Sequence, residues 1–188
     1  MSTDRIGERL RRYRRAARKT LLDVASEAGL SAGFLSQAER NLSGVSLSSL
    51  ANIAKALNVP LRLLLDQPEQ RSADSHAGRR QRYSTVDQGQ SYERLSSSFP
   101  GSQINAVKMC LPVGYASETV SHDGDEFVYV LSGRVRYRVG GEEYLLEAGD
   151  SLHFDGRQNH DLANVGDIAV EVVSVGTLAL FDDAPPAS

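Results

Sequence analysis

The spacing of apolar residues changes once along the chain, and this change is the strongest constraint on its fold. Before residue 67 apolar residues recur every three or four positions, as at Ile6, Leu10 and Tyr13, which predicts amphipathic helices. After residue 79 they recur every second position, as in residues 134–139, which predicts half-buried strands. The 188 residues are therefore expected to form an α+β protein with a helical domain and an antiparallel sheet domain.

Composition supports the same division. We expect a helical domain at residues 1–66, a linker at 67–78, a sheet domain at 79–182 and a flexible tail at 183–188. The linker is polar and has almost nothing to bury. The first 66 residues carry 11 Lys/Arg against 6 Asp/Glu, whereas the remaining residues carry 10 against 18. This asymmetry predicts that only the helical domain contacts a polyanion.

Two short helices with a tight turn between them are predicted early in the chain. Thr20 can cap the first helix with Asp23 as its capping-box partner. Gly29 can adopt the left-handed conformation that ends this helix, and Ser31 can cap the next one. Two capped helices in this arrangement are typical of a helix-turn-helix.

A family resemblance covers residues 5–66. The stretch TLLDVASEAGLSAGFLSQAERNLSGVSLSSLANIAKALNVPLRLLL closely resembles the helix-turn-helix of the phage-repressor-like, or XRE, family. The resemblance implies a five-helix bundle, in which residues 47–57 supply the fourth helix and Pro60 begins a short fifth. It also implies that Arg14 pairs with Glu39 inside the bundle.

The same resemblance implies that the second helix of the motif enters the major groove of DNA. Gln37 is the best candidate to read a base, because its amide can donate to and accept from adenine. Phe34 can contact a thymine methyl group or face the core, and both alternatives stay open. The predicted DNA-binding residues are Ser31, Ala32, Gly33, Phe34, Ser36, Gln37, Asn41, Ser43 and Arg12.

A second resemblance covers roughly residues 104–181. The stretch GYASETVSHDGDEFVYVLSG, followed by GDSLHFDGRQNHDLAN, is similar to the two motifs of the cupin superfamily. Val120 stands where the family has its first His, and Asp155 and Arg157 replace its Pro and Gly. The resemblance implies an antiparallel β-barrel, a double-stranded β-helix, with its site inside. The matching positions are Gly114, His122, Glu126, Gly133, Gly149, His160 and Asn164.

We call His122, Glu126 and His160 the trio. His122 and Glu126 lie four positions apart on one predicted strand and share a face, and the resemblance implies that His160 lies beside them. Two imidazoles and one carboxylate form the ligand set of a facial triad and suit Zn, Fe, Ni or Mn. The trio can instead hydrogen-bond an organic effector, so the sequence leaves a metal and an organic ligand as alternatives.

Together the two resemblances are those of the XRE–cupin regulators of bacteria. They imply a DNA-binding transcriptional regulator, a repressor, whose barrel binds a small-molecule effector or a divalent metal and which has no catalytic residues. We expect a homodimer on double-stranded operator DNA, joined mainly through residues 79–182. The alternative is an enzyme, because the iron-dependent hydroxypropylphosphonate epoxidases share the helix-turn-helix and cupin layout and the His-x3-Glu pattern.

The remaining features bear on the compartment. No apolar run approaches the roughly 20 residues of a membrane span, and the N-terminus shows no secretory signal. Cys110 is the only cysteine and cannot form an internal disulfide, so a buried, inert thiol is expected. These features predict a cytoplasmic protein that does not contact a membrane.

Overall fold

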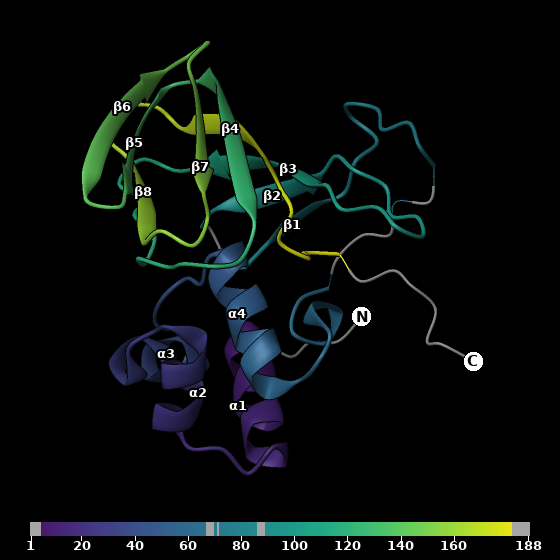
Figure 1. The fold of residues 1–188 in the computed structure, drawn as a ribbon, viewed down its shortest axis with the longest axis vertical. Helices are drawn as coiled ribbons and strands as arrows, with labels where there is room; N and C mark the ends of the chain where they lie inside the picture. The colour runs from purple at the N-terminus through teal and green to yellow at the C-terminus, as the bar shows by residue number, and fades with distance from the viewer. Residues whose placement is uncertain (1–4, 67–69, 71, 86–88, 182–188) are drawn as a thin grey trace.

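A computed structural model shows the helices and the strands as two adjoining bodies (Figure 1). The structure describes residues 5–66, 70, 72–85 and 89–181. Part of the predicted linker and the predicted tail at 183–188 lie outside these residues. We refer to residues 5–66 as the helical region and to residues 79–181 as the sheet region.

Within the described residues the helical region holds four α-helices and one 3-10 turn. They are α1 Ile6–Ala16, α2 Leu21–Ala28, α3 Ala32–Glu39, α4 Leu47–Leu57 and η1 Leu61–Leu63. The short fifth helix predicted after Pro60 is a 3-10 turn and not an α-helix. The amides of Leu63 and Leu64 bond three residues back, to Pro60 and Leu61, which is the 3-10 pattern. The segment is too short for a second helical turn, and the tight 3-10 turn still buries Leu61 and Leu64.

The predicted caps are confirmed. The Thr20 hydroxyl accepts a hydrogen bond from the Asp23 amide, and the Asp23 carboxylate accepts one from the Thr20 amide. Gly29 ends α2 with a φ of 69°, a conformation that costs a residue with a Cβ more than glycine. The Ser31 hydroxyl accepts from the Phe34 amide at 3.0 Å and begins α3. The turn between the two helices is therefore fixed by local chemistry.

A buried ion pair joins α1 to α3. The Arg14 guanidinium donates to both carboxylate oxygens of Glu39, from Nε at 2.6 Å and from Nη2 at 2.8 Å. The Glu39 side chain is only 6% exposed. The structural role that the family resemblance implied for Arg14 is confirmed.

The sheet region holds nine strands within the described residues. They are β1 Arg82–Ser84, β2 Ser91–Arg94, β3 Asn105–Leu111, β4 Asp125–Ser132, β5 Arg134–Val139, β6 Glu142–Glu147, β7 Ser151–Asp155, β8 His160–Asn164 and β9 Val170–Gly176.

These strands form two antiparallel sheets. One has the order β1-β2-β3-β9-β4-β7 and the other the order β6-β5-β8. The prediction of a closed barrel is confirmed only as two facing sheets, because no ladder of the described residues joins one sheet to the other. The chain crosses between sheets at the turn from β6 to β7, so β7 pairs with β4 and not with its predecessor. Isolated bridges from Ala116 to Ala163 and from Val120 to His160 bring the segment before β4 against β8.

Alternation within β5 agrees with the sequence pattern. Val135, Tyr137 and Val139 are buried, whereas Arg134 and Arg138 are exposed. The following Gly140 and Gly141 have φ of 59° and 95°, and Val139 pairs with Glu142 across them. Two consecutive positive φ angles are those of a type I′ hairpin turn.

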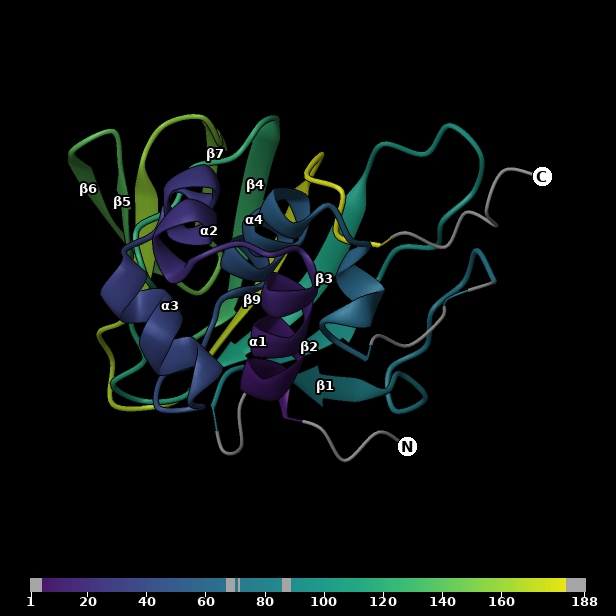
Figure 2. The ribbon, with the colours of Figure 1, turned by 90° about the horizontal axis from the view of Figure 1, so that it is seen from below.

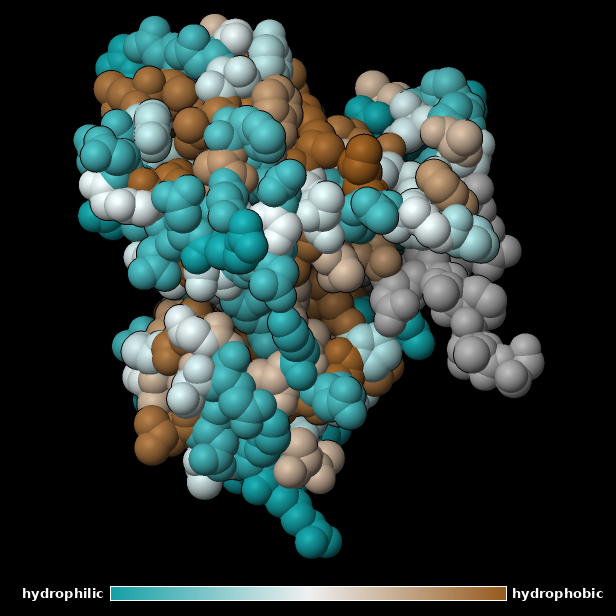
Figure 3. All heavy atoms as spheres, in the orientation of Figure 1, coloured by the Kyte–Doolittle hydropathy of each residue, from teal (hydrophilic) through white to brown (hydrophobic). Residues whose placement is uncertain are grey.

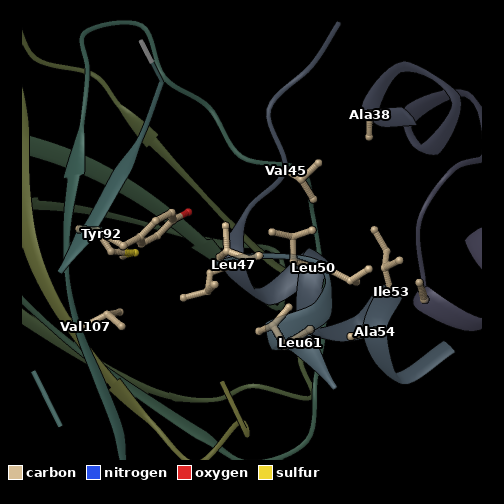
Figure 4. Packing of buried hydrophobic residues seen from close by; sticks show 14 of the residues in the cluster. Ala38, Val45, Leu47, Leu50, Ile53, Ala54, Leu61, Tyr92 and Val107 are labelled. Atoms are coloured by element: carbon tan, nitrogen blue, oxygen red, sulfur yellow. The ribbon is translucent and has the colours of Figure 1, made fainter. Parts of the chain in front are cut away.

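The two regions are in contact. Seen from below, the helices lie across the sheet region (Figure 2). Helix α4 points its N-terminus at the strands, and Leu47 at that end packs toward Tyr92 of β2 (Figures 1 and 4). No helix of the described residues is long and apolar enough to span a membrane.

Truncating Arg14 tests the ion pair. Arg14→Ala leaves the Glu39 carboxylate buried without its partner, so we expect a loss of about 3 kcal/mol in the free energy of unfolding. Urea denaturation followed by circular dichroism measures this loss. Arg15→Ala, on the exposed side of α1, is the matched control and is expected to change stability by less than about 0.5 kcal/mol. Equal effects of the two substitutions would contradict the assignment.

Candidate functional site

The exposed face of α3 carries the predicted base reader. Gln37 and Gly33 are exposed, whereas Leu35 faces the core. Ala32, Phe34 and Ser36 are half-buried, and Phe34 packs against the core as well as reaching the surface. The side chain of Gln37 therefore lies outside the core and is accessible to the groove of a DNA duplex.

Three other predicted DNA-binding residues have different surroundings. Asn41 has a φ of 56°, and its Oδ1 accepts from the amide of Gly7 at 2.9 Å, so it fixes the start of α1. The Ser43 Oγ is buried and has no hydrogen-bond partner among the described residues, so it faces inward. Arg12 is exposed, with its guanidinium 5.3 Å from the centre of the Tyr13 ring.

The structure brings the trio together at one end of a cavity between the sheets. His122 Nε2 lies 3.3 Å from Glu126 Oε2, and His160 Nε2 lies 3.8 Å from the same oxygen. The two imidazole rings meet edge to face, with centroids 5.0 Å apart. His122 precedes β4, Glu126 is on β4 and His160 begins β8, so elements of both sheets build the trio.

Backbone carbonyls set the tautomer of both histidines. His122 Nδ1 lies 3.2 Å from the Asp123 carbonyl, and His160 Nδ1 lies 2.8 Å from the Gln158 carbonyl. A carbonyl only accepts, so each Nδ1 carries a hydrogen, and each Nε2 is left facing the Glu126 carboxylate. This is how histidines that bind metals are oriented.

Burial and charge act differently on the two histidines. Burial lowers the pKa of His122, but the hydrogen bond and charge of Glu126 raise it, and the net pKa lies above the ordinary value. At His160 burial is the stronger influence. The net pKa of His160 therefore lies below the ordinary value, although the charge of Glu126 raises it. The neutral form, which is the form that binds metals, is therefore favoured more at His160 than at His122.

The donor set fits a divalent ion. Ligand atoms about 2 Å from a metal lie about 3–3.5 Å from one another. One atom from each member of the trio falls within 4.8 Å of the others, so small side-chain adjustments suffice. The trio could therefore hold a metal, and the same atoms could bind a polar organic group.

Three residues around the trio are not indicated by any sequence motif. The Ser174 hydroxyl of β9 donates to Glu126 Oε1 at 3.1 Å. A Cβ at Gly156 would lie 2.6 Å from the His122 ring, so this position holds the imidazole in place by having no side chain. Ser46 of the helical region lines the cavity together with the trio. Only strand pairing could have found Ser174, and no local pattern could have found the other two.

Other polar and aromatic side chains of the sheet region have different surroundings. Tyr115 lines the cavity, but Tyr129 is 40% exposed on the outer face of β4. Tyr137 is buried in the core, and Arg136 lies near Asp161. The expected buried thiol of Cys110 is half-buried on β3.

Comparison with known proteins identifies both regions. Residues 10–64 match the family model for the helix-turn-helix, and residues 107–176 match that for the cupin domain. The HTH-type transcriptional regulator SutR of Escherichia coli is 26% identical over 171 residues, which cover 88% of this chain and 90% of that protein.

A solved structure agrees on the fold. An HTH_3 family transcriptional regulator from Vibrio cholerae superposes with a TM-score of 0.58 and 19% identity, over 92% of this chain and 94% of that one. Hydroxypropylphosphonic acid epoxidase from S. wedmorenis has a TM-score of 0.47 and 20% identity, over 90% of this chain and 95% of its own. The second similarity is too weak to bear on activity. The chain therefore combines an XRE-type helix-turn-helix domain with a cupin domain in one polypeptide.

Proposed function

We propose that the protein is a sequence-specific transcriptional repressor whose cupin domain binds a small ligand. The observation that carries the proposal is the pairing of an exposed α3 face, led by Gln37, with an enclosed trio on the same chain. The relative from Escherichia coli, a regulator by name, supports the DNA-binding role. The proposed domain boundaries are those expected from the sequence, 1–66, 67–78 and 79–182.

We assign the contacts with DNA as follows. Helix α3 enters the major groove, and Gln37 reads a base edge. Basic residues of α1, Arg12 among them, attract phosphates without regard to sequence. Ser31 and Asn41 position the backbone at the start of α3 and in the loop after it. Ser43 can contribute only after its hydroxyl turns outward.

The cavity selects by charge. Its described lining is mostly apolar and contains two acidic side chains, Glu126 and Asp161, with no Lys or Arg. Without a metal this lining favours a neutral or cationic ligand. A divalent ion (Zn, Fe, Ni or Mn) on the trio would reverse the local charge and allow a ligand oxygen to coordinate it.

An apolar outer face supports a homodimer. Phe127, Tyr129 and Leu131 are 40%, 40% and 43% exposed along β4. Val173 and Val175 of β9 pair with Tyr129 and Phe127 and extend this face. Apolar side chains gather over this part of the surface (Figure 3). A patch of this kind on a soluble protein favours association, here with a second copy.

An iron-dependent oxygenase or epoxidase is the competing function, because the trio is also a facial triad. The regulator and the enzyme differ in their behaviour toward DNA. Nanomolar binding to the promoter of its own gene supports the regulator, and its absence together with iron-dependent turnover supports the enzyme.

Two substitutions separate base reading from phosphate attraction. Gln37→Ala removes one base contact, so we expect a loss of about 1–3 kcal/mol on the preferred DNA and none on scrambled DNA. Arg12→Ala is expected to weaken both alike. Fluorescence anisotropy at fixed salt measures the affinities. Equal losses on both DNAs for Gln37→Ala would contradict the readout assignment.

Metal content tests the trio. The purified protein is expected to hold about one divalent ion per chain, and His122→Ala to abolish binding. Ser174→Ala removes a hydrogen bond to Glu126 and is expected to weaken metal binding about 10–100-fold. Elemental analysis and calorimetry measure both effects, and Ser151→Ala on the exposed side of β7 is the control. Substoichiometric metal under metal-replete conditions would leave only an organic ligand.

Two leucines test the dimer face. Leu131→Asp places a charge on the outer face of β4, so we expect the dimer to dissociate into chains of 20.4 kDa. Leu145→Asp on β6 introduces the same charge at a site that is 57% exposed, and its dimer is expected to persist. Light scattering at micromolar concentration measures the masses. A monomeric wild-type protein would refute the dimer.

A further inference from the structure

The helical region forms part of the wall of the cavity that holds the trio. Ser46, Leu47 and Ser48, where α4 begins, line the same cavity as His122, Glu126 and His160. We call residues 45–48 the α4 turn. Leu47 lies on one side of this space and Val107 of β3 on the other (Figure 4). The DNA-binding domain therefore contributes one wall of the ligand site.

Side chains of the sheet region hold the α4 turn in place. Gln90 Nε2 donates to the Val45 carbonyl at 3.0 Å, and Glu118 Oε1 accepts from the Ser46 amide at 2.9 Å. The hydroxyl of Tyr92 points toward α4 (Figure 4). Amides in the first turn of a helix lack partners within the helix, and the positive end of the helix dipole favours a carboxylate. The α4 turn is therefore docked by groups that complement its backbone.

The same segment of the sheet region both docks α4 and supplies a member of the trio. Glu118 caps the α4 turn, and the Ser121 carbonyl accepts from Asn52 Nδ2 at 2.9 Å. His122 follows at once in the chain. The ion pair between Lys55 and Asp123 is 3.3 Å long but highly exposed, so it adds little. A shift of this segment on ligand binding would move His122 of the trio and would also disturb the hydrogen bonds that hold the α4 turn.

The cavity is small while the α4 turn is docked. The cavity measures about 60 Å³, which is room for a metal ion and a few water-sized groups. Ligand pockets for larger molecules measure roughly 300–1,000 Å³. A larger ligand therefore needs more room than the docked arrangement gives. The strand walls are held by ladders of hydrogen bonds, whereas the α4 turn is held by individual hydrogen bonds.

Withdrawal of the α4 turn would move the DNA-reading helix. Leu50 and Ile53 of α4 are fully buried in the core of the helical region. Interiors packed in this way transmit displacement instead of absorbing it. The α4 turn and α3 therefore move as one body.

We propose that the α4 turn is a latch: filling the cavity and docking the helical region exclude each other, so a bulky effector undocks the DNA-reading head. The inference rests on the proposed function. Docking fixes the separation of the two heads of a dimer, which DNA with two half-sites requires. A filled cavity therefore weakens binding to such DNA and leaves binding to a single half-site unchanged.

Paired substitutions test the latch in the full chain without an identified effector. Val107→Phe fills the cavity, so amide exchange in residues 45–49 is expected to accelerate about tenfold and affinity for two-half-site DNA to fall about tenfold. Leu47→Ala in the same chain makes room again and is expected to restore both. The DNA is that selected by the wild-type protein from a random library, and exchange is followed by mass spectrometry.

A second variant weakens the contact that holds the α4 turn and leaves the cavity lining unchanged. Glu118→Ala removes the acceptor for the Ser46 amide and is expected to accelerate exchange in residues 45–49 by about tenfold or more. Glu143→Ala, an exposed carboxylate on β6, is the control and should change neither exchange nor DNA affinity.

The outcomes distinguish the latch from the proposed function. A folded Val107→Phe protein with unchanged exchange at 45–49 and unchanged DNA affinity overturns the latch. If Val107→Phe does not fold, unchanged exchange in Glu118→Ala overturns it. If the wild-type protein prefers no DNA sequence, the proposed function fails, while the exchange measurements still decide whether cavity and dock are coupled.

Discussion

Burial of α4 along most of its length is the constraint on which the rest of the structure depends. Leu50, Ile53 and Ala54 lie in the core of the helical region, where α4 packs against α2 and η1, and Leu47 at its start reaches the sheet region. One helix of 11 residues thus serves the cores of two domains. Because the Ser46 amide donates to Glu118 and the Val45 carbonyl accepts from Gln90, the domain contact is made of directional bonds as well as apolar area. Such a contact has a defined geometry and can be lost in one step.

Features that depend on neighbours in sequence could be predicted. The Thr20 cap, the left-handed Gly29 and the hairpin at Gly140 and Gly141 each follow from the chemistry of a few adjacent residues. The alternation of apolar and charged residues along β5 predicted that Val135 and Tyr137 are buried, even though the partner strands were not known. Arg14 with Glu39 and His160 with Glu126 are distant in sequence, and only the resemblance to known families anticipated them.

Features that depend on the meeting of distant segments could not be predicted. The η1 turn forms because Leu61 and Leu64 must reach a core that α4 has already shaped. The two-sheet arrangement depends on where β7 finds a partner. The inward hydroxyl of Ser43 and the place of Ser46 in the cavity depend on how the helical region meets the sheet region. Local patterns carry no information about such encounters.

Gly156 has a consequence for reading related sequences. Any side chain there would meet the His122 ring at 2.6 Å and the Gly124 carbonyl at 2.9 Å, and a backbone carbonyl cannot move aside alone. A relative that carries a larger residue at this place must have displaced its imidazole or replaced it. The identity of this one position thus serves as a sequence marker for an intact trio, and it separates relatives that keep this binding chemistry from those that keep only the fold.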